Sequence, residues 1–322
     1  MAKGQKAAGK QKGGVLQSIP LACADEHVAV AFLEQLRWGR DCRHACPRCG
    51  SDDVYVVMAR KEPEKRNADY RWRCRGCGRY HTVRTGTVME DSRIPLRHWC
   101  HAFWKVCSSK KGISAKQIQR ESGLSYKSAL FLMHRVRFAL ADMNGCKLSG
   151  TVEVDETYVG GKPRPGTGPH KPGRGTKKTP VVGLVQRAGD VRAGVIPDVT
   201  MKTLRGAMRE HVDPSSRIIT DEFSSYRGTG REFAGGHETV NHGRREYSRG
   251  DVHTNTAESF FALIKRGIYG TFHAVSKRHL HRYVSEFEFG WNTRKDDDGE
   301  RVAKAIRASQ GKRLMYREPD VA

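Results

Sequence analysis

The stretch Thr151-Val152-Glu153-Val154-Asp155-Glu156-Thr157-Tyr158-Val159 decides the fold of the second half of the chain. Its apolar residues at positions 152, 154 and 158 alternate with polar residues at 153, 155 and 157, and this period of two predicts a β-strand with one face in a core. Neighbouring side chains of a strand point to opposite faces. Asp155 and Glu156 are therefore not expected to share a face.

The elements predicted after this strand place two more acids at notable positions. Strand patterns at 181–186, 191–197 and 217–220, with a helix at about 202–211, lead to Asp221 at the end of the last strand. Further helices are predicted at about 255–266, with Glu258 in the first turn, and at about 277–292. Two strands and a helix can bring Asp155, Asp221 and Glu258 together.

A cluster of three carboxylates points to divalent cations. Like charges a few ångströms apart repel each other unless cations lie between them, and Mg²⁺ is the hard, oxygen-preferring cation that also binds phosphate oxygens. Two such ions activate an attacking oxygen and stabilise the leaving oxygen in an in-line displacement at phosphorus. Lys265 follows Glu258 on the same helical stripe, where it can meet a phosphate held by the metals.

Each of these residues also has a structural alternative. Asp221 can cap the segment that follows its strand, and Glu258 can complete a capping interaction with Asn255. Glu153 or Glu156 can be the ligand in place of Asp155. Lys265 can be a lysine that faces solvent. The residue pattern alone leaves these alternatives open.

Two Cys-x-x-Cys pairs precede this region and predict a zinc ribbon. β-like runs at 54–58 and 70–73 lie between the pairs, and Gly50 and Gly78 directly after each pair permit the backbone conformations that such tight turns need. Four thiolates in a tetrahedron suit Zn²⁺, whereas the alternative is four reduced structural cysteines. The expected ligands are Cys46, Cys49, Cys74 and Cys77; Cys42 and His44 are possible substitutes, and Cys100 and Cys107 are expected to pack in a core.

Four helices are predicted around the ribbon, at 25–38, 95–108, 114–122 and 125–142. The last two are joined by a turn at Gly123 and resemble a helix-turn-helix, whose later helix can enter the major groove of DNA. The alternative is an ordinary helical hairpin with a basic, solvated face. The basic residues of the later helix are Lys127, His134, Arg135 and Arg137.

Composition sets the class of partner. The 322 residues include 58 Lys and Arg against 35 Asp and Glu, a formal net charge of +23, which favours nucleic acid as the partner. No 18-residue apolar run is present, so no membrane-spanning helix is expected. Nothing near the start resembles a signal peptide, which predicts a cytoplasmic, nucleoid-associated protein. Nine cysteines in such a chain favour metal ligation over disulfides.

Three runs resemble the catalytic blocks of bacterial insertion-sequence DDE transposases that carry an N-terminal zinc ribbon. They are residues 154–161 (VDETYVGG), 220–226 (TDEFSSY) and 252–270 (VHTNTAESFFALIKRGIYG). Residues 84–88 (RTGTV) and 95–99 (PLRHW), together with the two cysteine pairs, are similar to the zinc-ribbon region of that family. The resemblance covers about residues 25 to 300.

The resemblance implies an RNase H-like catalytic domain, a mixed sheet flanked by helices, in an α+β multidomain chain. It implies Asp155, Asp221 and Glu258 as ligands of Mg²⁺ or Mn²⁺, with Lys265 as the basic residue after the third acid, and a structural Zn²⁺ in the ribbon. The third acidic position varies in related families, and Asn255 lies one turn before Glu258. The implied partners are the terminal inverted repeats of the element and target DNA, both as duplexes, and further copies of the chain on DNA.

The expected organisation has five parts. They are a disordered basic arm at 1–24, a zinc ribbon with a preceding helix at 25–92, a helix-turn-helix-like segment at 93–149, the catalytic domain at 150–294 and a polar tail at 295–322. Residues 159–178, with six basic residues, six glycines, four prolines and no acid, predict a flexible loop that lies along phosphates. The expected DNA-contacting residues are Lys127, Arg135, Lys171, Arg174, Lys177, Lys178, Arg244 and Arg245.

Two other functions fit the same residues. One is a zinc-ribbon DNA-binding regulator in which the acids are structural and no bond is cut. The other is an RNase H-like nuclease or resolvase, which cuts DNA without joining it. Strand cleavage and strand transfer distinguish the three functions.

Overall fold

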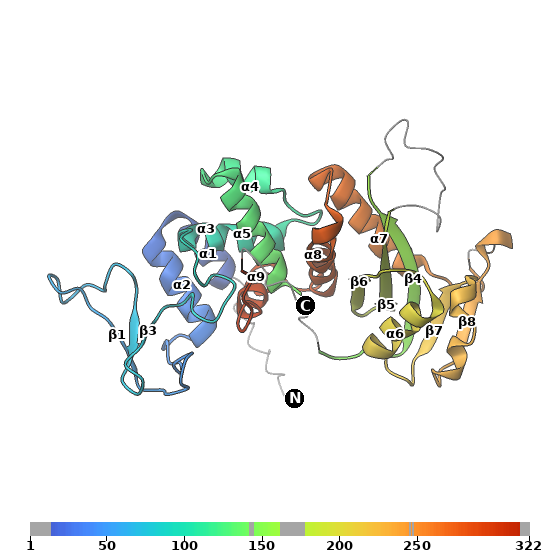
Figure 1. Cartoon of the computed structure of the whole chain (residues 1–322), viewed down its shortest axis with the longest axis horizontal. Helices are drawn as coiled ribbons and strands as arrows, with labels where there is room; N and C mark the ends of the chain where they lie inside the picture. The colour runs from blue at the N-terminus through green and yellow to red at the C-terminus, as the bar shows by residue number, and fades with distance from the viewer. Residues whose placement is uncertain (1–13, 142–144, 162–177, 245, 247, 316–322) are drawn as a thin grey trace, which may run out of the picture. The chain divides into compact units, whose positions relative to one another are not determined.

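The computed structural model describes residues 14–141, 145–161, 178–244, 246 and 248–315 (Figure 1). The chain divides into two compact units. One, here called the ribbon unit, contains residues up to 108, residues 118–139 and the segment from 296; the other, the sheet unit, contains residues 109–117 and 140–295. Each unit is described separately.

The sheet unit is built on a five-stranded mixed sheet in the order β6-β5-β4-β7-β8. β4, β5 and β6 pair antiparallel, whereas β4, β7 and β8 pair parallel. This agrees with the mixed sheet flanked by helices that the family resemblance implies. The bounds are β4 Thr151–Val159, β5 Thr179–Gln186, β6 Val191–Val195, β7 Arg217–Asp221 and β8 His237–Val240.

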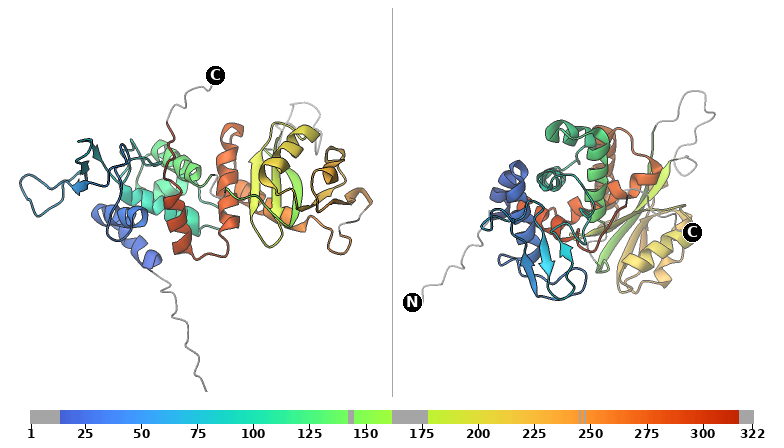
Figure 2. Two further views of the ribbon diagram at one scale, coloured as in Figure 1. Left: turned by 90° about the horizontal axis from the view of Figure 1, so that it is seen from below. Right: turned by 60° about the vertical axis from the view of Figure 1, so that its left-hand side comes forward.

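Helices cover both faces of this sheet, as Figures 1 and 2 show. Val152 and Val154 of β4 belong to one core cluster with Leu204 and Met208 of α6 (Met201–His211). The opposite face packs against α7 (Asn255–Gly267) and α8 (Leu280–Asn292) through a second cluster that includes Val159 of β4. The strand predicted for residues 151–159 is therefore confirmed, but both of its faces are covered, and Glu153 and Thr157 on the second face are buried.

The ribbon unit contains a three-stranded antiparallel sheet and a set of helices. The strands are β1 Val54–Val56, β2 Trp72–Cys74 and β3 Tyr80–His81. Its helices are α1 Gly14–Ala24, α2 Glu26–Trp38, α3 Leu96–Ser108, α5 Tyr126–Ala139 and α9 Asp298–Arg307; α4, Ala115–Ser122, has residues in both units.

A buried carboxylate fixes the small sheet to α2. Glu34 is only 3% exposed, and its two oxygens accept hydrogen bonds from Arg66 at 2.8 and 2.7 Å and from Trp72 Nε1 at 2.8 Å. A carboxylate buried at this depth is stable only when it is paired and hydrogen-bonded. Glu34 therefore joins the ribbon to the helix that precedes it.

Both ends of the described chain contain helices where none was expected. Residues 14–24 form α1, which buries Ile19 and Ala22, so the basic arm predicted at 1–24 is wrong for these residues. Residues 298–307 form α9, which buries Val302 and Ile306 within the predicted polar tail. Both helices pack on α3, which supplies the apolar partners that a short segment needs. Residues 1–13 lie outside the described part of the chain.

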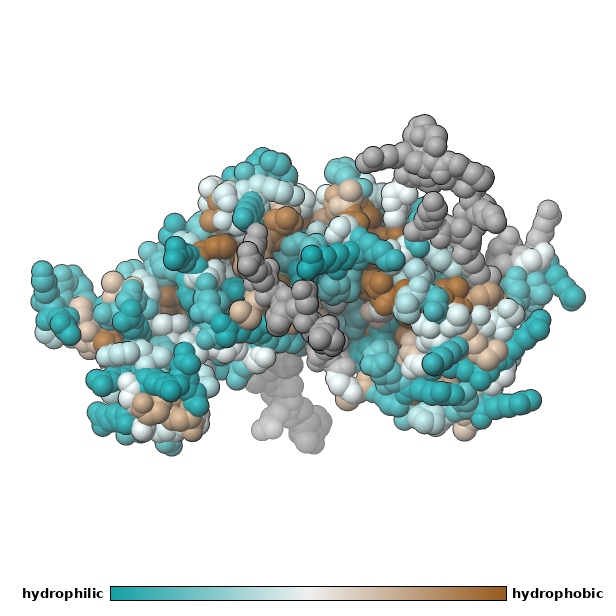
Figure 3. Space-filling model, in the orientation of Figure 1, coloured by the Kyte–Doolittle hydropathy of each residue, from teal (hydrophilic) through white to brown (hydrophobic). Residues whose placement is uncertain are grey.

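Two further differences concern element lengths. α5 ends at Ala139 rather than near residue 142, and β8 was not predicted from its Gly- and His-rich surroundings. In the view of Figure 3 most of the surface is hydrophilic, as the mean hydropathy of −0.66 leads one to expect. Within the described residues, none of the helices combines the length and apolar composition needed to cross a bilayer.

Candidate active site and metal centre

Asp155 and Asp221 lie on neighbouring strands, each two positions beyond the last paired residues. β4 and β7 run parallel with the pairs Thr151–Arg217, Val152–Ile218 and Glu153–Ile219. Adjacent strands are about 4.8 Å apart. Because position 155 has the same parity as 153, and 221 the same parity as 219, both carboxylates leave the sheet on one face.

Glu258 lies in the first turn of α7, and a buried acid of β4 holds the start of this helix. Glu153, which is 0% exposed, accepts hydrogen bonds from Thr256 N at 2.8 Å, Ala257 N at 3.0 Å and Thr256 Oγ1 at 2.9 Å. These are donors of the first helical turn, which have no partner within the helix. Glu153 precedes Asp155 by two positions on the same face of β4, and Glu258 directly follows Ala257.

Arg187 and His253 complete the contacts of Glu153. Arg187 Nε donates to Glu153 Oε1 at 2.8 Å, and its terminal nitrogen donates to the His253 carbonyl at 3.0 Å. His253 Nδ1 lies 3.4 Å from Glu153 Oε1. This network connects β4, the end of β5 and the segment before α7. From the sequence, Glu153 was expected only as a substitute ligand. Its position two residues before Asp155, on the same face of the strand, was the sequence feature that indicates a positioning role.

The acids influence each other electrostatically. Burial raises the pKa of Asp155 to about 7, and the charges of Glu156, Asp221 and Glu258 add to this increase, against a lowering effect from the Glu156 N–H. That N–H donates to Asp155 Oδ1 at 2.7 Å. Burial is thus the largest cause of the raised pKa and the neighbouring carboxylates are a smaller one, and a perturbed pKa of this kind is common at functional sites.

The structure separates the alternatives for the first acid. Glu153 is fully buried under the start of α7, so it has no exposed oxygen for a ligand. Glu156 lies on the opposite face, where it accepts a hydrogen bond from the buried Tyr226 hydroxyl at 2.8 Å. Asp221 Oδ1 accepts from Phe223 N at 3.1 Å, which closes a local turn, but the short helix Ser224–Tyr226 has Phe223 at its N-cap and no side-chain cap, so Asp221 does not cap it.

Lys265 lies on the exposed side of α7, as do Asn255 and Glu258. It lines a pocket of about 570 Å³ together with Lys111, Arg266 and Tyr269. Three cationic side chains around one hollow suit an anionic ligand such as a phosphate. This pocket lies entirely within the sheet unit.

Four cysteines of the ribbon unit form a metal-binding group. Sγ atoms of Cys46 and Cys77 are 3.9 Å apart, those of Cys49 and Cys74 are 3.6 Å apart, and all four lie within 4.8 Å of one another. Tetrahedral zinc with bonds of about 2.3 Å would separate its sulfur ligands by about 3.8 Å. The donor set and its spacing therefore fit a structural Zn²⁺ ion.

Backbone geometry at the two cysteine pairs also agrees with the sequence. Gly50 has φ of 78° and Gly78 has φ of 69°, and each donates its N–H at 2.9 Å to the carbonyl of the first cysteine of its pair. A Cβ is disfavoured at such φ values. Both glycines thus close the turns that bring the thiols together.

The proposed substitute ligands take other roles. The His44 ring stacks on Trp38 with centroids 3.6 Å apart, and its Nε2 lies 2.8 Å from His81 Nε2. In the described part of the chain, the four cysteines are the one group of three or more candidate ligands with ligand atoms within 4.8 Å of one another. Neither Cys42 nor His44 belongs to it, nor do Asp155, Asp221 and Glu258 form a second such group. Cys100 and Cys107 are buried in α3, as predicted.

One expected DNA contact is wrong. Arg135 is 5% exposed, and its guanidinium donates to the carbonyl oxygens of Leu314 at 3.1 Å and Glu90 at 2.8 Å. His134 and Arg137 are buried too, so α5 has no basic solvated face at these positions. The Arg135 guanidinium is hydrogen-bonded to backbone carbonyl oxygens and buried, so it is not available to bind a phosphate. The periodicity of α5 did not show this because the Leu314 and Glu90 carbonyls, which are distant in the sequence, were not expected to lie against the helix.

The other expected contacts divide into two groups. Lys127 at the start of α5 and Arg244 are exposed, and Lys178 is half-buried beside β5. Lys171, Arg174, Lys177 and Arg245 lie outside the described residues.

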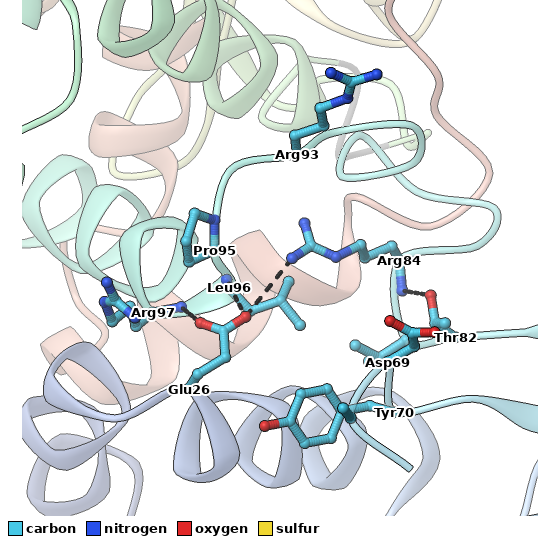
Figure 4. A pocket seen from close by; sticks show the side chains of 11 residues that line it. Glu26, Asp69, Tyr70, Thr82, Arg84, Arg93, Pro95, Leu96 and Arg97 are labelled. Carbon is cyan, nitrogen blue, oxygen red and sulfur yellow. Dashed lines mark hydrogen bonds and ion pairs between the residues drawn. The ribbon is translucent and has the colours of Figure 1, made fainter. Parts of the chain in front are cut away.

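A second pocket, of about 400 Å³, lies in the ribbon unit, where Glu26 of α2 contacts the start of α3 (Figure 4). Glu26 of α2 accepts hydrogen bonds from Leu96 N at 2.7 Å and Arg97 N at 3.0 Å, the first donors of α3, and Arg84 lies 3.7 Å away. Arg84 also donates to the Ile94 carbonyl at 2.9 Å. Glu26 therefore holds the start of α3 and pairs with Arg84 at this pocket.

Comparisons with known proteins agree with this arrangement. Residues 147–292 match the ISXO2-like transposase domain, and residues 24–80 match the transposase zinc-ribbon domain. A protein of Halobacterium salinarum (strain ATCC 700922 / JCM 11081 / NRC-1), described as an uncharacterized protein in transposable element ISH50, is 32% identical over 276 residues, which cover 82% of this chain and 90% of that protein.

Among solved structures, a pre-cleavage Mos1 transpososome matches 62% of this chain and 75% of its own chain at 16% identity, with a TM-score of 0.22 that carries no argument. The two family matches and the Halobacterium salinarum relative identify the family. This chain belongs to the insertion-sequence transposases that combine an amino-terminal zinc ribbon with an ISXO2-like transposase domain.

Proposed function

We propose that this transposase binds the ends of its mobile element as duplex DNA and catalyses metal-dependent hydrolysis and strand transfer with Asp155, Asp221 and Glu258. The observation that supports the proposal best is the parallel pairing of β4 and β7 up to Glu153–Ile219, because each aspartate lies two residues further along its strand. The hydrogen bonds of Glu153 to the start of α7 also support it, because Glu258 lies in the first turn of that helix.

The donor set fits Mg²⁺ or Mn²⁺. Carboxylate oxygens are the ligands that these hard cations prefer, and Asp155 is the acid whose pKa the other carboxylates raise. Asp155 of β4, Asp221 of β7 and Glu258 of α7 would hold the cations. Two bound cations would activate the attacking oxygen and stabilise the leaving one.

The protein's own residues then position the DNA. In the first step a water oxygen attacks a phosphodiester at the element end, the P–O bond to the 3′ oxygen breaks, and a 3′-hydroxyl is released. In the second step that hydroxyl attacks a phosphodiester of target DNA: a new P–O bond joins the element end to the target, the target's own P–O bond to its 3′ oxygen breaks, and this oxygen leaves as a 3′-hydroxyl. No covalent enzyme intermediate is needed. Lys265, with Lys111 and Arg266 around its pocket, contacts a phosphate next to the reacting one.

Other basic residues hold the duplex away from the reacting bond. The exposed Lys127 lies at the start of α5, where a recognition helix contacts DNA. Lys178 and Arg244, with Lys171, Arg174, Lys177 and Arg245 from the sequence, supply phosphate contacts. We expect the active form to be a homo-oligomer on DNA in the cytoplasm, at the nucleoid, because transposition joins two ends.

A cleavage assay tests the proposal. The probe is a duplex with the sequence that flanks the gene, incubated with the full chain and Mg²⁺ or Mn²⁺. Asp155→Ala, Asp221→Ala and Glu258→Ala are expected to bind the duplex as the wild type does but to lose cleavage by about 10³-fold or more. Glu222→Ala is the matched control, because Glu222 is an exposed acid next to Asp221.

Four results would overturn the proposal in part or whole. Unchanged cleavage by the aspartate variants would exclude these acids from catalysis. Binding with no cleavage by any form of the chain would support a zinc-ribbon regulator. Cleavage without joined product in a strand-transfer assay would support a nuclease or resolvase. Loss of activity in Asn255→Ala but not in Glu258→Ala would show that the third ligand is Asn255, one helical turn earlier, and not Glu258.

A further inference from the structure

The small sheet of the ribbon unit has one face composed of arginine and tyrosine. Tyr55 on β1 pairs with Arg73 on β2, and Arg73 pairs with Tyr80 on β3, so these three residues form one row across the sheet. Residues directly opposite each other on neighbouring strands share a face. Arg71 and Arg75 flank Arg73 two positions away on either side and therefore extend the same face.

The tyrosine rings support the three guanidinium groups. Arg71 and Arg73 lie over Tyr80 at 5.8 and 5.4 Å from the ring centroid, and Arg75 lies over Tyr55 at 5.1 Å. These are cation–π distances. A guanidinium held against a ring loses less conformational freedom when it binds a ligand, because its orientation is already restricted.

This face is exposed, whereas the reverse face is covered. The three arginines and Tyr80 are exposed. On the reverse side Trp72, Cys74 and His81 are buried, and Trp72 is hydrogen-bonded to Glu34 of α2. The arginine–tyrosine face (Tyr55, Arg71, Arg73, Arg75 and Tyr80) is thus the side of the small sheet that a partner can reach.

Two acids border the face without neutralising it. Asp69 lies 2.7 Å from Arg71, and Asp53 lies 3.9 Å from Arg75. Both pairs are exposed to solvent, with between 48% and 67% of each side chain accessible. Exposed ion pairs of this kind contribute little free energy, and each arginine keeps further N–H donors for a second anion. No acid pairs with Arg73 among the described ion pairs; its Nε donates to the Gly78 carbonyl at 3.4 Å.

We propose that the arginine–tyrosine face binds the phosphate backbone of duplex DNA. This inference rests on the proposed function, and it assigns part of the binding of element ends to one face of the zinc ribbon. Arginines at alternate positions of a strand are about 6.6 Å apart, so each can contact a different phosphate. The tyrosine faces are occupied by guanidinium groups, which favours backbone contacts of a duplex over stacking with unpaired bases.

A matched pair of triple variants tests the proposal in the full, zinc-loaded chain. The test variant is Arg71→Ala/Arg73→Ala/Arg75→Ala. The control is Arg60→Ala/Lys61→Ala/Lys65→Ala, which removes the same charge from exposed residues of the same unit outside the face. The probes are a fluorescent duplex with the gene-flanking sequence, a shuffled duplex and a single strand of the same length, titrated at several salt concentrations.

The test variant is expected to lose about tenfold or more in affinity for both duplexes, with the slope of log K against log salt reduced by about 2 to 3. The control is expected to lose much less. Tyr80→Ala, which removes the ring and keeps every charge, is expected to show a smaller loss in the same direction. Zinc content and thermal unfolding of each variant show whether the ribbon is still folded.

Several results would overturn this inference. Equal losses in the two triple variants would show an effect of net charge alone, and a loss confined to the single strand would exclude duplex backbone. Duplex binding unchanged in a folded, zinc-loaded test variant would exclude the face. The proposed function fails differently, through cleavage that survives Asp155→Ala, and that result leaves a binding loss in the arginine variant unaffected.

Discussion

Asp155 is half-buried on β4, and burial together with three neighbouring carboxylates raises its pKa to about 7. In the unfolded chain the same group titrates near its ordinary value of 3.8. The folded protein therefore binds more protons than the unfolded chain between these two values. The contribution of Asp155 to stability falls as the pH rises through this window, and above pH 7 it is a constant penalty of a few kcal/mol.

This linkage predicts a pH-dependent effect of metal. Without divalent cations, Asp155→Asn is expected to stabilise the fold at pH 8 and to change little at pH 4, because the neutral amide avoids the charge penalty. Mg²⁺ or Mn²⁺ is expected to raise the melting temperature of the wild type at pH 8 more than at pH 5, and not that of Asp155→Asn. Calorimetry with and without EDTA measures both effects. A cation effect that is equal in the two proteins at pH 8 would contradict a metal role for Asp155.

Cys49 gives a prediction for the zinc site. Its sulfur lies 3.6 Å from that of Cys74 in the group of four, so Cys49→Ser is expected to reduce bound zinc from about one equivalent to much less and to unfold the ribbon, since structural zinc supplies folding free energy. Metal analysis and circular dichroism follow the change. Cys146→Ser, at an exposed cysteine outside the group, is the control. Zinc retained in Cys49→Ser would exclude this cysteine as a ligand.

Single residues differ in whether their roles could be predicted from the sequence. The two cysteine pairs and their glycines could be predicted because all the determinants are local. The burial of Arg135 could not be predicted, because its guanidinium binds the carbonyl of Leu314, which is 179 positions away in the sequence. The separate roles of Glu153 and Asp155, two positions apart on one face, likewise depend on where α7 begins relative to β4.

The start of α7 is the element on which the position of Glu258 depends. Glu153→Ala would leave Arg187 and two helix N–H groups without their carboxylate partner, and loss of one member of a buried pair costs about 3 to 5 kcal/mol. Glu153→Gln keeps the shape and is expected to cost less.

In the folded fraction of either variant, we expect a lower kcat for cleavage, a higher Mg²⁺ concentration for half-maximal rate and unchanged duplex affinity. Glu210→Ala, at an exposed acid of α6, is the control. If Glu153→Gln loses stability while its kcat and its Mg²⁺ requirement match those of the wild type, Glu153 supports the fold but does not position Glu258.

Helices and strands with a clear periodicity of apolar residues could be predicted from the sequence, whereas elements that depend on tertiary contacts could not. The strand at residues 151–159 and the helices α2, α3, α4 and α7 agree with their predicted ranges to within one or two residues. β8 has only four residues and is formed by pairing with β7, so no local pattern identifies it. α1 and α9 are stabilised by packing on α3, which a reading of either segment alone does not reveal.

At the level of the whole chain, the charge of +23 and the two-part organisation have one explanation. The four-cysteine ribbon and the mixed sheet with its acids are held in separate compact units, which suits a protein that binds DNA with one part and cuts it with another. The charge predicted a polyanionic partner but not its location. Only the cross-strand pairs of β1, β2 and β3 show that arginines and tyrosines share an exposed face.

The most direct test of the central claim is the position of bound Mn²⁺. Crystals of the full chain soaked in Mn²⁺ and measured by anomalous diffraction are expected to show manganese between the carboxylates of Asp155, Asp221 and Glu258, separate from a zinc signal at the four cysteines. Manganese ordered elsewhere while these carboxylates bind none, or carboxylates that point to different regions of the sheet unit, would contradict the claim.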